Sequence, residues 1–363
     1  MNERLAIGCM TGTSLDGLDV ALVRARGTGL ELEVELIDAR AFDLGELREP
    51  LLDFARGGAL TALGVADLAR RFGELHAAAV VEVARGRALS LVAVHGQTVA
   101  HAPPNSLQLV NPWPIVRDAN ARVVADLRGA DLAAGGEGAP ITPLADLVLF
   151  GHEQKRRAIV NLGGFANVTH LPAVAPGARA AAGARITGGD VTPCNHWLDG
   201  LARHLFDRPF DEDGALAATG HADAATVARF ADELTAIRSR ARSMGSAEER
   251  ADLERLVGDT EPHAALASAV QAIAAAVADS ARDADEVLLA GGSTANRALV
   301  DALAAACHAP VHSTSAVGID ARWREAIAMA VLGLVADDGV PITLAAVTGA
   351  TRPPRAGAWY RPG

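Results

Sequence analysis

Hydroxyls, glycines and carboxylates crowd into one short segment near the start of the chain. It reads Met-Thr-Gly-Thr-Ser-Leu-Asp-Gly-Leu-Asp from Met10 to Asp19. Gly12 and Gly17 allow positive φ and close approach of the backbone, and successive amides in such a turn form a concavity that binds anions. Thr13 and Ser14 add hydroxyl donors, so the segment suits a phosphate chain. A tight hairpin whose side chains only cap the backbone is the alternative interpretation.

The two carboxylates of this turn suggest a metal ion beside the phosphate. Asp16 and Asp19 cannot bind phosphate directly, because like charges repel. A carboxylate at such a place can instead hold Mg²⁺ through the water ligands of the ion. We therefore expect Mg²⁺ to accompany a nucleotide here.

Two further glycine turns point to the same kind of ligand. The segment Asn-Leu-Gly-Gly-Phe-Ala-Asn at 161–167 would hold the phosphates from the other side. The segment Gly-Gly-Ser-Thr-Ala-Asn at 291–296 precedes an expected helix and could pack on adenosine or its phosphates. Neither a GxxxxGK[ST] loop nor a GxGxxG fingerprint occurs in the sequence. Each turn by itself is also compatible with an ordinary connection between elements.

The elements that would position these turns alternate between strands and helices. Apolar runs predict strands on both sides of the first turn, and a period of two predicts a half-buried strand at 30–36. A helix is expected after Thr61, with Leu68, Phe72, Leu75 and Ala79 on one face. The strands predicted in this half of the chain are 5–9, 20–23, 30–36, 91–94 and 122–125.

The second half repeats the opening of the first. A strand at 157–161, the second glycine turn and a strand at 167–171 are followed by helices near Pro193 and Asp213. A long helix around 266–277, a buried strand at 287–290, a helix from Ala295 and a last helix at 321–335 complete the half. The glycine- and proline-rich stretch from Asp126 to Pro143 marks a boundary.

The composition limits the possible number of domains, the partners and the location of the protein. The chain has 363 residues, 50% of them hydrophobic, which favours two folded domains. A net charge of −11 makes nucleic acid and membrane surfaces poor partners. The three cysteines, Cys9, Cys194 and Cys307, lack CxxC spacing and argue against disulfides and zinc. No uncharged apolar run reaches the length of a membrane span, and we expect a cytoplasmic protein.

These motifs together resemble the anhydro-N-acetylmuramic acid kinases. The similarity covers nearly the whole chain in the family's order, and the opening turn, the HGQT segment at 95–98 and the DLAAGG segment are specific to that family. The resemblance implies an α/β, two-domain, actin/hexokinase-like fold, that is, a duplicated ribonuclease H-like fold, with a nucleotide cleft between the domains. We expect residues 1–128 and 336–363 in domain I and residues 129–335 in domain II. The matching segments are 10–19, 95–98, 125–140, 161–167, 188–195, 210–214, 323–330 and 347–350.

The resemblance also implies an activity. Such an enzyme opens 1,6-anhydro-N-acetylmuramic acid with water and phosphorylates the freed 6-oxygen from ATP, giving N-acetylmuramic acid 6-phosphate and ADP in cell-wall recycling. Its cofactors would be ATP and Mg²⁺, its partners an amino sugar and a second copy of the chain in a homodimer. Two alternatives stay open: a kinase for a different amino sugar, and a non-catalytic nucleotide-binding regulator of the same superfamily.

The family's functional positions carry over onto residues of this chain. Asp190 takes the place of the catalytic base, which the reaction needs because water is a poor nucleophile; the alternative is that Asp190 caps a helix before Pro193. The implied substrate-binding residues are Glu325, Arg128, Asp131, His95 and Gln97. The implied ATP-binding residues are Gly12, Thr13, Ser14, Leu15, Asp16, Gly17, Leu18, Asp19, Asn161, Gly163, Gly164, Asn167, Gly291, Gly292 and Asn296, with Asp16 and Asp19 holding Mg²⁺ through water.

The chain departs from the family pattern at a few places. Thr192 and Cys194 stand where the family's aspartate motif carries glycines, and Ser293 replaces a glycine of the third turn. The segment 242–248 hardly matches the PKSTGRE-like segment of the family, and this favours the alternative of a different amino sugar.

Overall fold

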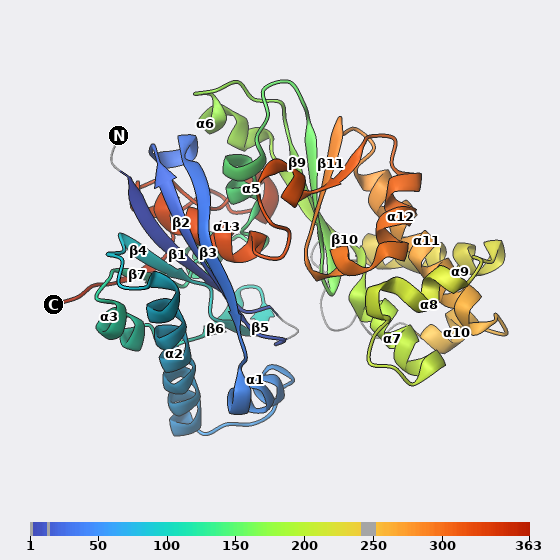
Figure 1. The fold of residues 1–363 in the computed structure, drawn as a ribbon, viewed down its shortest axis with the longest axis horizontal. Helices are drawn as coiled ribbons and strands as arrows, with labels where there is room; N and C mark the ends of the chain where they lie inside the picture. The colour runs from blue at the N-terminus through green and yellow to red at the C-terminus, as the bar shows by residue number, and fades with distance from the viewer. Residues whose placement is uncertain (1–2, 13–14, 241–251) are drawn as a thin grey trace. The chain divides into compact units, whose positions relative to one another are not determined.

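The chain folds into two compact units (Figure 1). The computed structural model describes residues 3–12, 15–240 and 252–363, so the divergent segment 242–248 lies outside the described residues. Unit 1 comprises Met1–Gly151, Val174–Ile186 and Trp323–Gly363, and unit 2 comprises His152–Ala173 and Thr187–Arg322. The chain therefore leaves unit 2 once for a short return to unit 1 before its last segment.

Unit 1 is built on a six-stranded mixed sheet with the order β13-β7-β4-β1-β2-β3. β1 is antiparallel to β2 and β2 to β3, whereas β4 runs parallel to both β1 and β7. A separate two-stranded sheet pairs β5 with β6. The strands are β1 (Arg4–Met10), β2 (Leu18–Arg26), β3 (Glu33–Phe42), β4 (Leu91–Val94), β5 (Gln97–Ala102), β6 (Asn105–Leu109), β7 (Val123–Ala125) and β13 (Ala358–Tyr360).

Unit 2 is built on a five-stranded mixed sheet with the order β10-β9-β8-β11-β12. β8 is antiparallel to β9 and β9 to β10, whereas β11 runs parallel to both β8 and β12. The strands of each sheet can be counted in chain order. In both sheets, the third, second, first, fourth and fifth strands then lie side by side in that order. This repetition confirms the predicted α/β class with two matching halves. The strands are β8 (Arg157–Leu162), β9 (Phe165–Leu171), β10 (Thr187–Pro193), β11 (Glu286–Ala290) and β12 (Val311–Ser313).

Different helices cover the two faces of the unit 1 sheet, because side chains alternate along a strand. Ile7 and Cys9 lie in one hydrophobic core with Phe72 of α2, while Gly8 faces α13. The helix that the sequence predicts after Thr61 is α2, and Thr61 caps it by accepting the Gly64 N–H at 3.1 Å. The helices are α1 (Arg48–Ala55), α2 (Ala62–Ala84), α3 (Trp113–Ala119), α4 (Gly129–Ala133), α5 (Pro143–Phe150), α6 (Arg179–Ala182), α13 (Arg324–Asp337) and α14 (Ala345–Thr348), with short 3₁₀ turns at Gly29–Glu31, Gly45–Leu47 and Gly183–Arg185.

Helix α13 is the buried centre of unit 1. Its residues from Ala326 to Val335 are all buried, as expected of a helix that is apolar on every side. A Cβ on Gly8 would lie 1.9 Å from the Ala326 carbonyl oxygen, and one on Gly333 would lie 2.7 Å from the Cβ of Ala93. The helix therefore packs with its backbone directly against β1 and β4.

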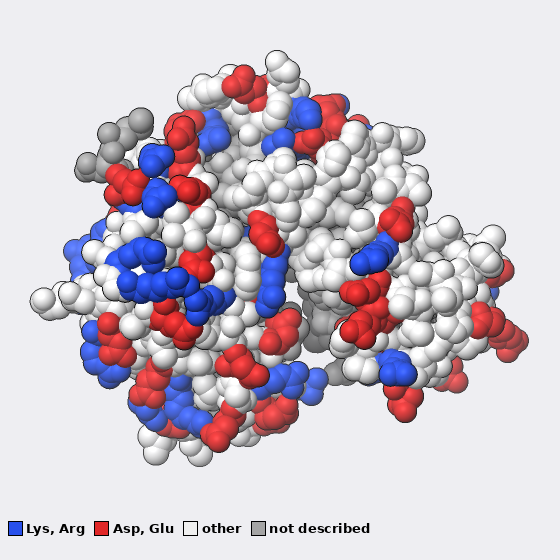
Figure 2. Space-filling model, in the orientation of Figure 1, with Lys and Arg blue, Asp and Glu red and all other residues white. Residues whose placement is uncertain are grey.

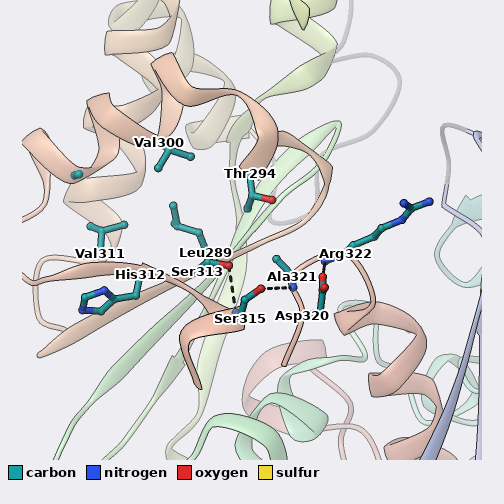
Figure 3. A pocket seen from close by; sticks show the side chains of 11 residues that line it. Leu289, Thr294, Val300, Val311, His312, Ser313, Ser315, Asp320, Ala321 and Arg322 are labelled. Atoms are coloured by element: carbon teal, nitrogen blue, oxygen red, sulfur yellow. Dashed lines mark hydrogen bonds between the residues drawn. The ribbon is translucent and has the colours of Figure 1, made fainter. Parts of the chain in front are cut away.

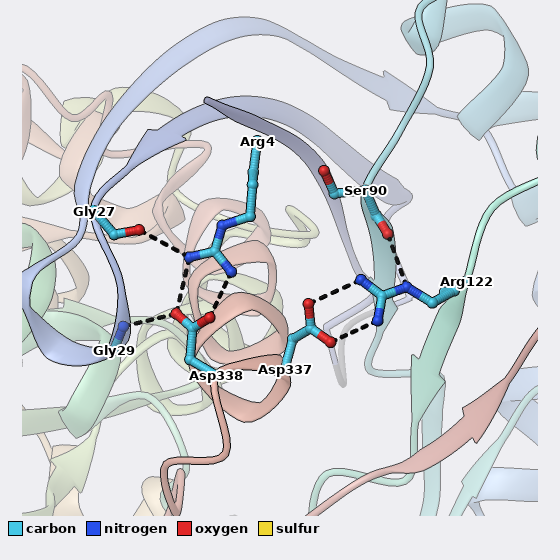
Figure 4. A network of polar contacts seen from close by, with 7 residues as sticks. All are labelled: Arg4, Gly27, Gly29, Ser90, Arg122, Asp337 and Asp338. Carbon is cyan, nitrogen blue, oxygen red and sulfur yellow. Dashed lines mark hydrogen bonds and ion pairs between the residues drawn. The ribbon is translucent and has the colours of Figure 1, made fainter. Parts of the chain in front are cut away.

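Two arginines fix the far end of α13 (Figure 4). Arg4 donates to both carboxylate oxygens of Asp338 at 2.7 and 2.8 Å, and Arg122 does the same to Asp337 at 2.7 and 2.9 Å. The Gly29 N–H also donates to Asp338, at 2.7 Å. Carboxylates are unfavourable at the negative end of a helix, so these pairs offset the helix dipole and hold the helix end to β1 and to the residue before β7.

Helices also bury one face of the unit 2 sheet. Alternate residues of β8 and β9 pack with Trp197, Phe230 and Ile273 in a single core. The helices are α7 (Asn195–Phe206), α8 (Ala215–Thr219), α9 (Ala224–Arg240), α10 (Leu253–Val257), α11 (Pro262–Ser280) and α12 (Arg297–Ala306), with 3₁₀ turns at Glu212–Gly214, Gly292–Ala295 and Thr314–Val317.

The predicted elements are present, with local differences. β4 covers the predicted range 91–94, and β8, β9 and β11 overlap their predictions. Leu30, predicted as the start of a strand, lies instead in a 3₁₀ turn, and the strand begins at Glu33. The hairpin of β5 and β6 has no counterpart among the predicted elements.

The surface carries its charges in mixed pairs. Acidic and basic side chains lie side by side over the face seen in Figure 2. Arg24, for example, pairs with Glu3 and Glu35, and Arg70 with Asp67 and Glu74. Within the described residues, no helix combines the length and apolarity of a membrane span.

The contact of Gly8 with α13 gives a prediction of stability. Gly8→Ala must push α13 away from β1, and we expect it to lower the free energy of unfolding by about 3 kcal/mol, the upper end for overpacking. Urea unfolding measures the loss. Gly183→Ala is the control, because its Cβ would meet only the Leu344 Cδ2, at 3.7 Å. Equal stability of the two variants would contradict the close packing of α13.

Candidate functional site

Unit 1 gathers its polar segments at one edge of the sheet. Because β1, β4 and β7 run parallel, the opening turn, the HGQT segment and the loop after β7 all leave from the same edge, where α/β sheets bind ligands. Helix α13 begins near this edge, since the Ala326 carbonyl lies against Gly8 of β1. Glu325, the residue before Ala326, is therefore brought to the same group of side chains.

His95 holds Arg128 in this group. The Nδ1 of His95 donates to the Gly96 carbonyl at 2.8 Å, so that Nε2 accepts from Arg128 Nη2 at 2.9 Å and Nε at 3.2 Å. Burial, with the Arg128 charge next, lowers the pKa of His95 to about 3 and keeps the ring neutral. Arg128 also donates to the Gly138 carbonyl at 2.8 Å. Burial lowers the pKa of Arg128 to about 10, which marks a poorly solvated cation that an anionic ligand would stabilise.

Gln97 and Asp131 differ in what their side chains leave available. Gln97 is fully buried and donates to the Thr98 carbonyl at 3.2 Å, while its Oε1 has no partner among the described residues. Asp131 is equally buried, but its carboxylate accepts from the Gly138 N–H at 2.9 Å and from the Thr348 hydroxyl at 2.8 Å. Gln97 therefore retains an acceptor for a ligand, whereas Asp131 ties the loop after β7 to α14.

Glu325 is a half-buried carboxyl in the first turn of α13. Its side chain makes no hydrogen bond or ion pair within the described part of the chain. Burial raises the pKa of Glu325; the charge of Arg324 opposes this shift, and those of Asp146 and Asp16 add to it. A carboxyl with a raised pKa and no ion pair, near a half-buried arginine, is typical of a functional site.

The opening turn places its residues in different surroundings. Leu15 has a positive φ of 52° and donates its N–H to the Gly12 carbonyl at 3.2 Å. The side chains of Leu15 and Leu18 are fully buried in the core, so only their backbone could face a nucleotide. Asp16 is exposed and Asp19 is half-buried on β2. Thr13 and Ser14 lie outside the described residues.

The carboxylates of this turn fit a metal held mostly by water. Among the described residues, no group of three or more His, Cys, Asp or Glu could enclose a metal ion. Mg²⁺ is commonly held by one or two carboxylates together with water and substrate phosphates. The exposed carboxylate of Asp16, with Asp19 three residues on, is suited to that manner of binding.

In unit 2, Asp190 stands in a row of polar residues across three strands. Asp190 of β10 is paired with Asn167 of β9, which is paired with Asn161 of β8. Directly opposed residues point to the same face of a sheet, so the three side chains are neighbours. The alternative that Asp190 caps a helix is wrong, since α7 begins at Asn195 and follows Cys194. A bulge between Asp190 and Thr192 turns the strand immediately after the carboxylate.

The second glycine turn is bonded to the start of α7. The N–H groups of Cys194 and Asn195 donate to the carbonyls of Gly164 and Gly163 at 2.8 and 3.0 Å. A Cβ on Gly164 would lie 2.2 Å from the His196 Nε2. These contacts place the second turn beside the segment that follows Asp190.

The third glycine turn lies against the second. Gly291 has a φ of +92°, and a Cβ there would lie 2.5 Å from the Leu162 carbonyl and 2.9 Å from Asn161 Oδ1. Asn296 caps α12 by accepting the Leu299 N–H at 3.0 Å. Two of the three residues that replace the family's glycines meet here: Cys194 Sγ lies 3.9 Å from Ser293 Oγ. The structure thus joins three of the unit 2 segments that the sequence singles out, 161–167, 188–195 and 291–296.

A pocket of about 300 Å³ adjoins the third turn (Figure 3). Leu289 and Val300 supply apolar lining, and Thr294 and Ala321 supply polar contacts to the turn. The Thr294 hydroxyl donates to the Gly291 carbonyl at 2.7 Å, and the Gly291 N–H donates to the Ala321 carbonyl at 3.3 Å. Two residues that line the pocket, Thr294 and Ala321, are therefore hydrogen-bonded directly to the glycine turn.

Sequence reasoning missed two residues of the unit 1 group. Asp146 and Arg324 form a buried ion pair next to Glu325. Arg324 lies inside the WREAIAMA segment, and an arginine in an otherwise apolar helix is the signal that could have indicated a buried partner.

The strand order defines the class of the protein. Two sheets with the third-second-first-fourth-fifth arrangement, each carrying a glycine turn between its first two strands, are the duplicated ribonuclease H-like fold of the sugar kinase, actin and Hsp70 superfamily.

Sequence comparisons narrow this class to one family. The model of the anhydro-N-acetylmuramic acid kinase family matches residues 4–362. An anhydro-N-acetylmuramic acid kinase of Cyanothece sp. is 35% identical over 368 residues, covering 95% of this chain and 96% of its own. One of Acidiphilium cryptum is 35% identical over 370 residues, covering 99% and 98%. The chain belongs to the anhydro-N-acetylmuramic acid kinase family, as its motifs predict.

Solved structures of low sequence identity align over most of the chain. Component A of the (R)-2-hydroxyglutaryl-CoA dehydratase of Acidaminococcus fermentans aligns with a TM-score of 0.47 and 11% identity, covering 93% of this chain and 99% of its own. A ROK family glucokinase of Streptomyces griseus, in complex with glucose and AMPPNP, aligns with a TM-score of 0.38 and 15% identity, covering 90% and 98%. The fold assignment depends on the strand order of the chain itself.

The third turn gives a prediction that separates packing from ligand contact. Gly291→Ala introduces both a strained φ and a backbone clash, and we expect it to lower stability by about 2–3 kcal/mol. Gly292→Ala meets nothing within 4 Å and should unfold like the wild type. If nucleotide passes this turn, Gly292→Ala raises the KM for ATP with no change in the melting temperature. An unchanged KM for ATP would show that Gly292 is not part of the nucleotide site.

Proposed function

We propose that the chain is an ATP-dependent kinase that opens 1,6-anhydro-N-acetylmuramic acid and phosphorylates its 6-oxygen. The family match over residues 4–362 carries the proposal. In the reaction, the bond from the anomeric carbon to the 6-oxygen breaks and water adds to that carbon through an oxocarbenium-like state. The freed 6-oxygen takes the γ-phosphoryl group of ATP in line, leaving ADP.

Asp190 is the base that takes a proton from the attacking water. Its place in a row with Asn167 and Asn161 supports this role, because the two amides can orient a carboxylate and its water by hydrogen bonds. The bulge that follows Asp190 is a common means of aiming a side chain at a ligand.

The unit 1 group binds the sugar. Arg128 takes the lactyl carboxylate by a charge-assisted pair, because burial leaves this cation poorly solvated and its hydrogen-bond partners are neutral. Gln97 Oε1 accepts from a sugar hydroxyl, and Glu325 grips the sugar or assists the water. His95 uses both ring nitrogens inside the protein, so it serves the sugar by positioning Arg128. Asp131 positions the same loop.

The glycine turns bind ATP. Backbone amides around Gly12 and Gly17, around Gly163 and Gly164, and around Gly291 and Gly292 suit a triphosphate. Mg²⁺, held through water by Asp16 and Asp19, would neutralise charge on the phosphates when bound. The adenosine end lies at the third turn, beside the apolar pocket lined by Leu289 and Val300.

Two further parts of the proposal concern the protein in the cell. We propose a cytoplasmic enzyme, in keeping with the few unpaired cysteines, and a homodimer, which light scattering coupled to size exclusion would test. A kinase for another amino sugar stays the alternative, since the segment 242–248 departs from the family. A non-catalytic regulator is the less supported alternative, because Asp16, Asp190 and Glu325 are all present.

A coupled assay of ADP release tests the proposed reaction. We expect turnover with 1,6-anhydro-N-acetylmuramic acid and none above background with N-acetylglucosamine or without sugar. Asp190→Asn keeps the shape but cannot take the proton, so kcat should fall about 10²–10⁴-fold. Asp259→Asn, an exposed aspartate of the same unit, is the control and should match the wild type. Turnover on another sugar alone would show that the substrate is not 1,6-anhydro-N-acetylmuramic acid. Full activity of Asp190→Asn would show that Asp190 is not the base.

A further inference from the structure

A buried ion pair lies directly beside Glu325. Arg324, the first residue of α13, and Asp146 of α5 are 1% and 0% exposed at their side chains. Arg324 donates to Asp146 Oδ1 from Nε at 3.0 Å and from Nη2 at 2.6 Å, and Nη2 also contacts Oδ2. The two residues are 178 positions apart in the sequence, so this pair joins α5 to the start of α13.

The pair has an electrostatic consequence for its neighbour. Glu325 has no hydrogen bond or ion pair in the part of the chain that the structure describes, although Arg324 is adjacent. Buried charges interact strongly. Without a counter-ion, Arg324 would therefore be expected to pair with another nearby carboxylate, that of Glu325. Asp146 fills that role, and Glu325 stays available. The charged groups that act on Glu325 are Arg324, Asp146, Asp16 and Arg128.

We propose that Asp146 is a positioning residue for the kinase reaction: by engaging Arg324, it keeps the arginine from capturing Glu325 and leaves that carboxyl free for the sugar site. The proposal rests on the proposed function for the role of Glu325. Asp146 and Arg324 touch neither sugar nor nucleotide and act only through Glu325.

The electrostatics of the group agree with this geometry. Burial raises the pKa of Glu325, Arg324 lowers it, and Asp146 raises it. Without the charge of Asp146, the effect of Arg324 is unbalanced, and the pKa of Glu325 must fall. Without the charge of Arg324, the pKa must rise. A loss of packing alone would act on the pKa of Glu325 in the same direction in both variants.

The chain offers a matched control for bracing alone. Asp337 also accepts two hydrogen bonds from an arginine, at the other end of the same helix. Asp337→Asn weakens the attachment of α13 to β7 without changing a charge near Glu325. It therefore reports what loss of an α13 ion pair does by itself.

Carbon-13 NMR of protein labelled at the glutamate side-chain carboxyl tests the proposal without any substrate. The resonance missing from Glu325→Gln identifies Glu325, and its titration is followed in each variant. Asp146→Asn should shift the midpoint down in pH, Arg324→Met should shift it up, and Asp337→Asn should leave it in place. Shifts in the same direction for Asp146→Asn and Arg324→Met, or none, would overturn the proposal.

Activity on the anhydro sugar adds a second readout. Asp146→Asn should lower kcat about tenfold or more, part of the 10²–10⁴ contribution of an acid–base group, with little change in the KM for ATP. The double variant Asp146→Leu, Arg324→Met removes both charges, a replacement that buried pairs often tolerate, and should recover most of kcat. If Asp146→Asn does not fold, the double variant decides: a folded but inactive double variant overturns the proposal. A wild type without kinase activity would refute the proposed function, while the NMR titration still decides the role of Asp146.

Discussion

The contact between α13 and the first strand of unit 1 is the constraint on which the site depends. Because Gly8 has no side chain, the Ala326 carbonyl can approach β1 more closely than any other residue at this position would allow. The ion pairs of Asp337 and Asp338 fix the opposite end of the helix. The helix is buried on all sides, so it can neither slide nor rotate without losing core packing. Its first turn therefore holds Glu325 in one place, beside the carboxyl ends of the parallel strands.

Around that fixed point, the group of side chains is arranged by charge. Arg128 is a half-buried cation whose hydrogen-bond partners, His95 and the Gly138 carbonyl, are neutral, whereas Arg324 is a fully buried cation with an ionic partner, Asp146. Among the described residues, Arg128 hydrogen-bonds to no carboxylate, whereas Nε and Nη2 of Arg324 donate to Asp146. In unit 2, the carboxylate of Asp190 is in line with the amides of Asn167 and Asn161.

Local sequence patterns predict many of the strands, helices and turns. They do not predict contacts between residues that are distant in the sequence. The three glycine turns, the strand at 91–94 and the helix capped by Thr61 follow from apolar periodicity and turn chemistry, which act over a few residues. The family resemblance pointed to Asp190, Arg128 and Glu325. It gave no sign that Asp131 would be saturated by Gly138 and Thr348, or that Arg324 would find Asp146, because such contacts are set by how the sheet and helices pack. Leu30 lies in a 3₁₀ turn for a similar reason, since alternation alone does not fix where a strand starts.

Product analysis after reaction in ¹⁸O-labelled water tests most directly that one enzyme both opens the ring and transfers phosphate. We expect mass spectrometry at early times to find a phosphorylated amino sugar with one ¹⁸O at its anomeric carbon and none in its phosphate, since water attacks that carbon and ATP supplies the phosphoryl group. A phosphorylated sugar without label, or label found only in free phosphate, would contradict it. The first result would mean phosphorylation without hydrolytic ring opening, and the second would mean hydrolysis of ATP alone.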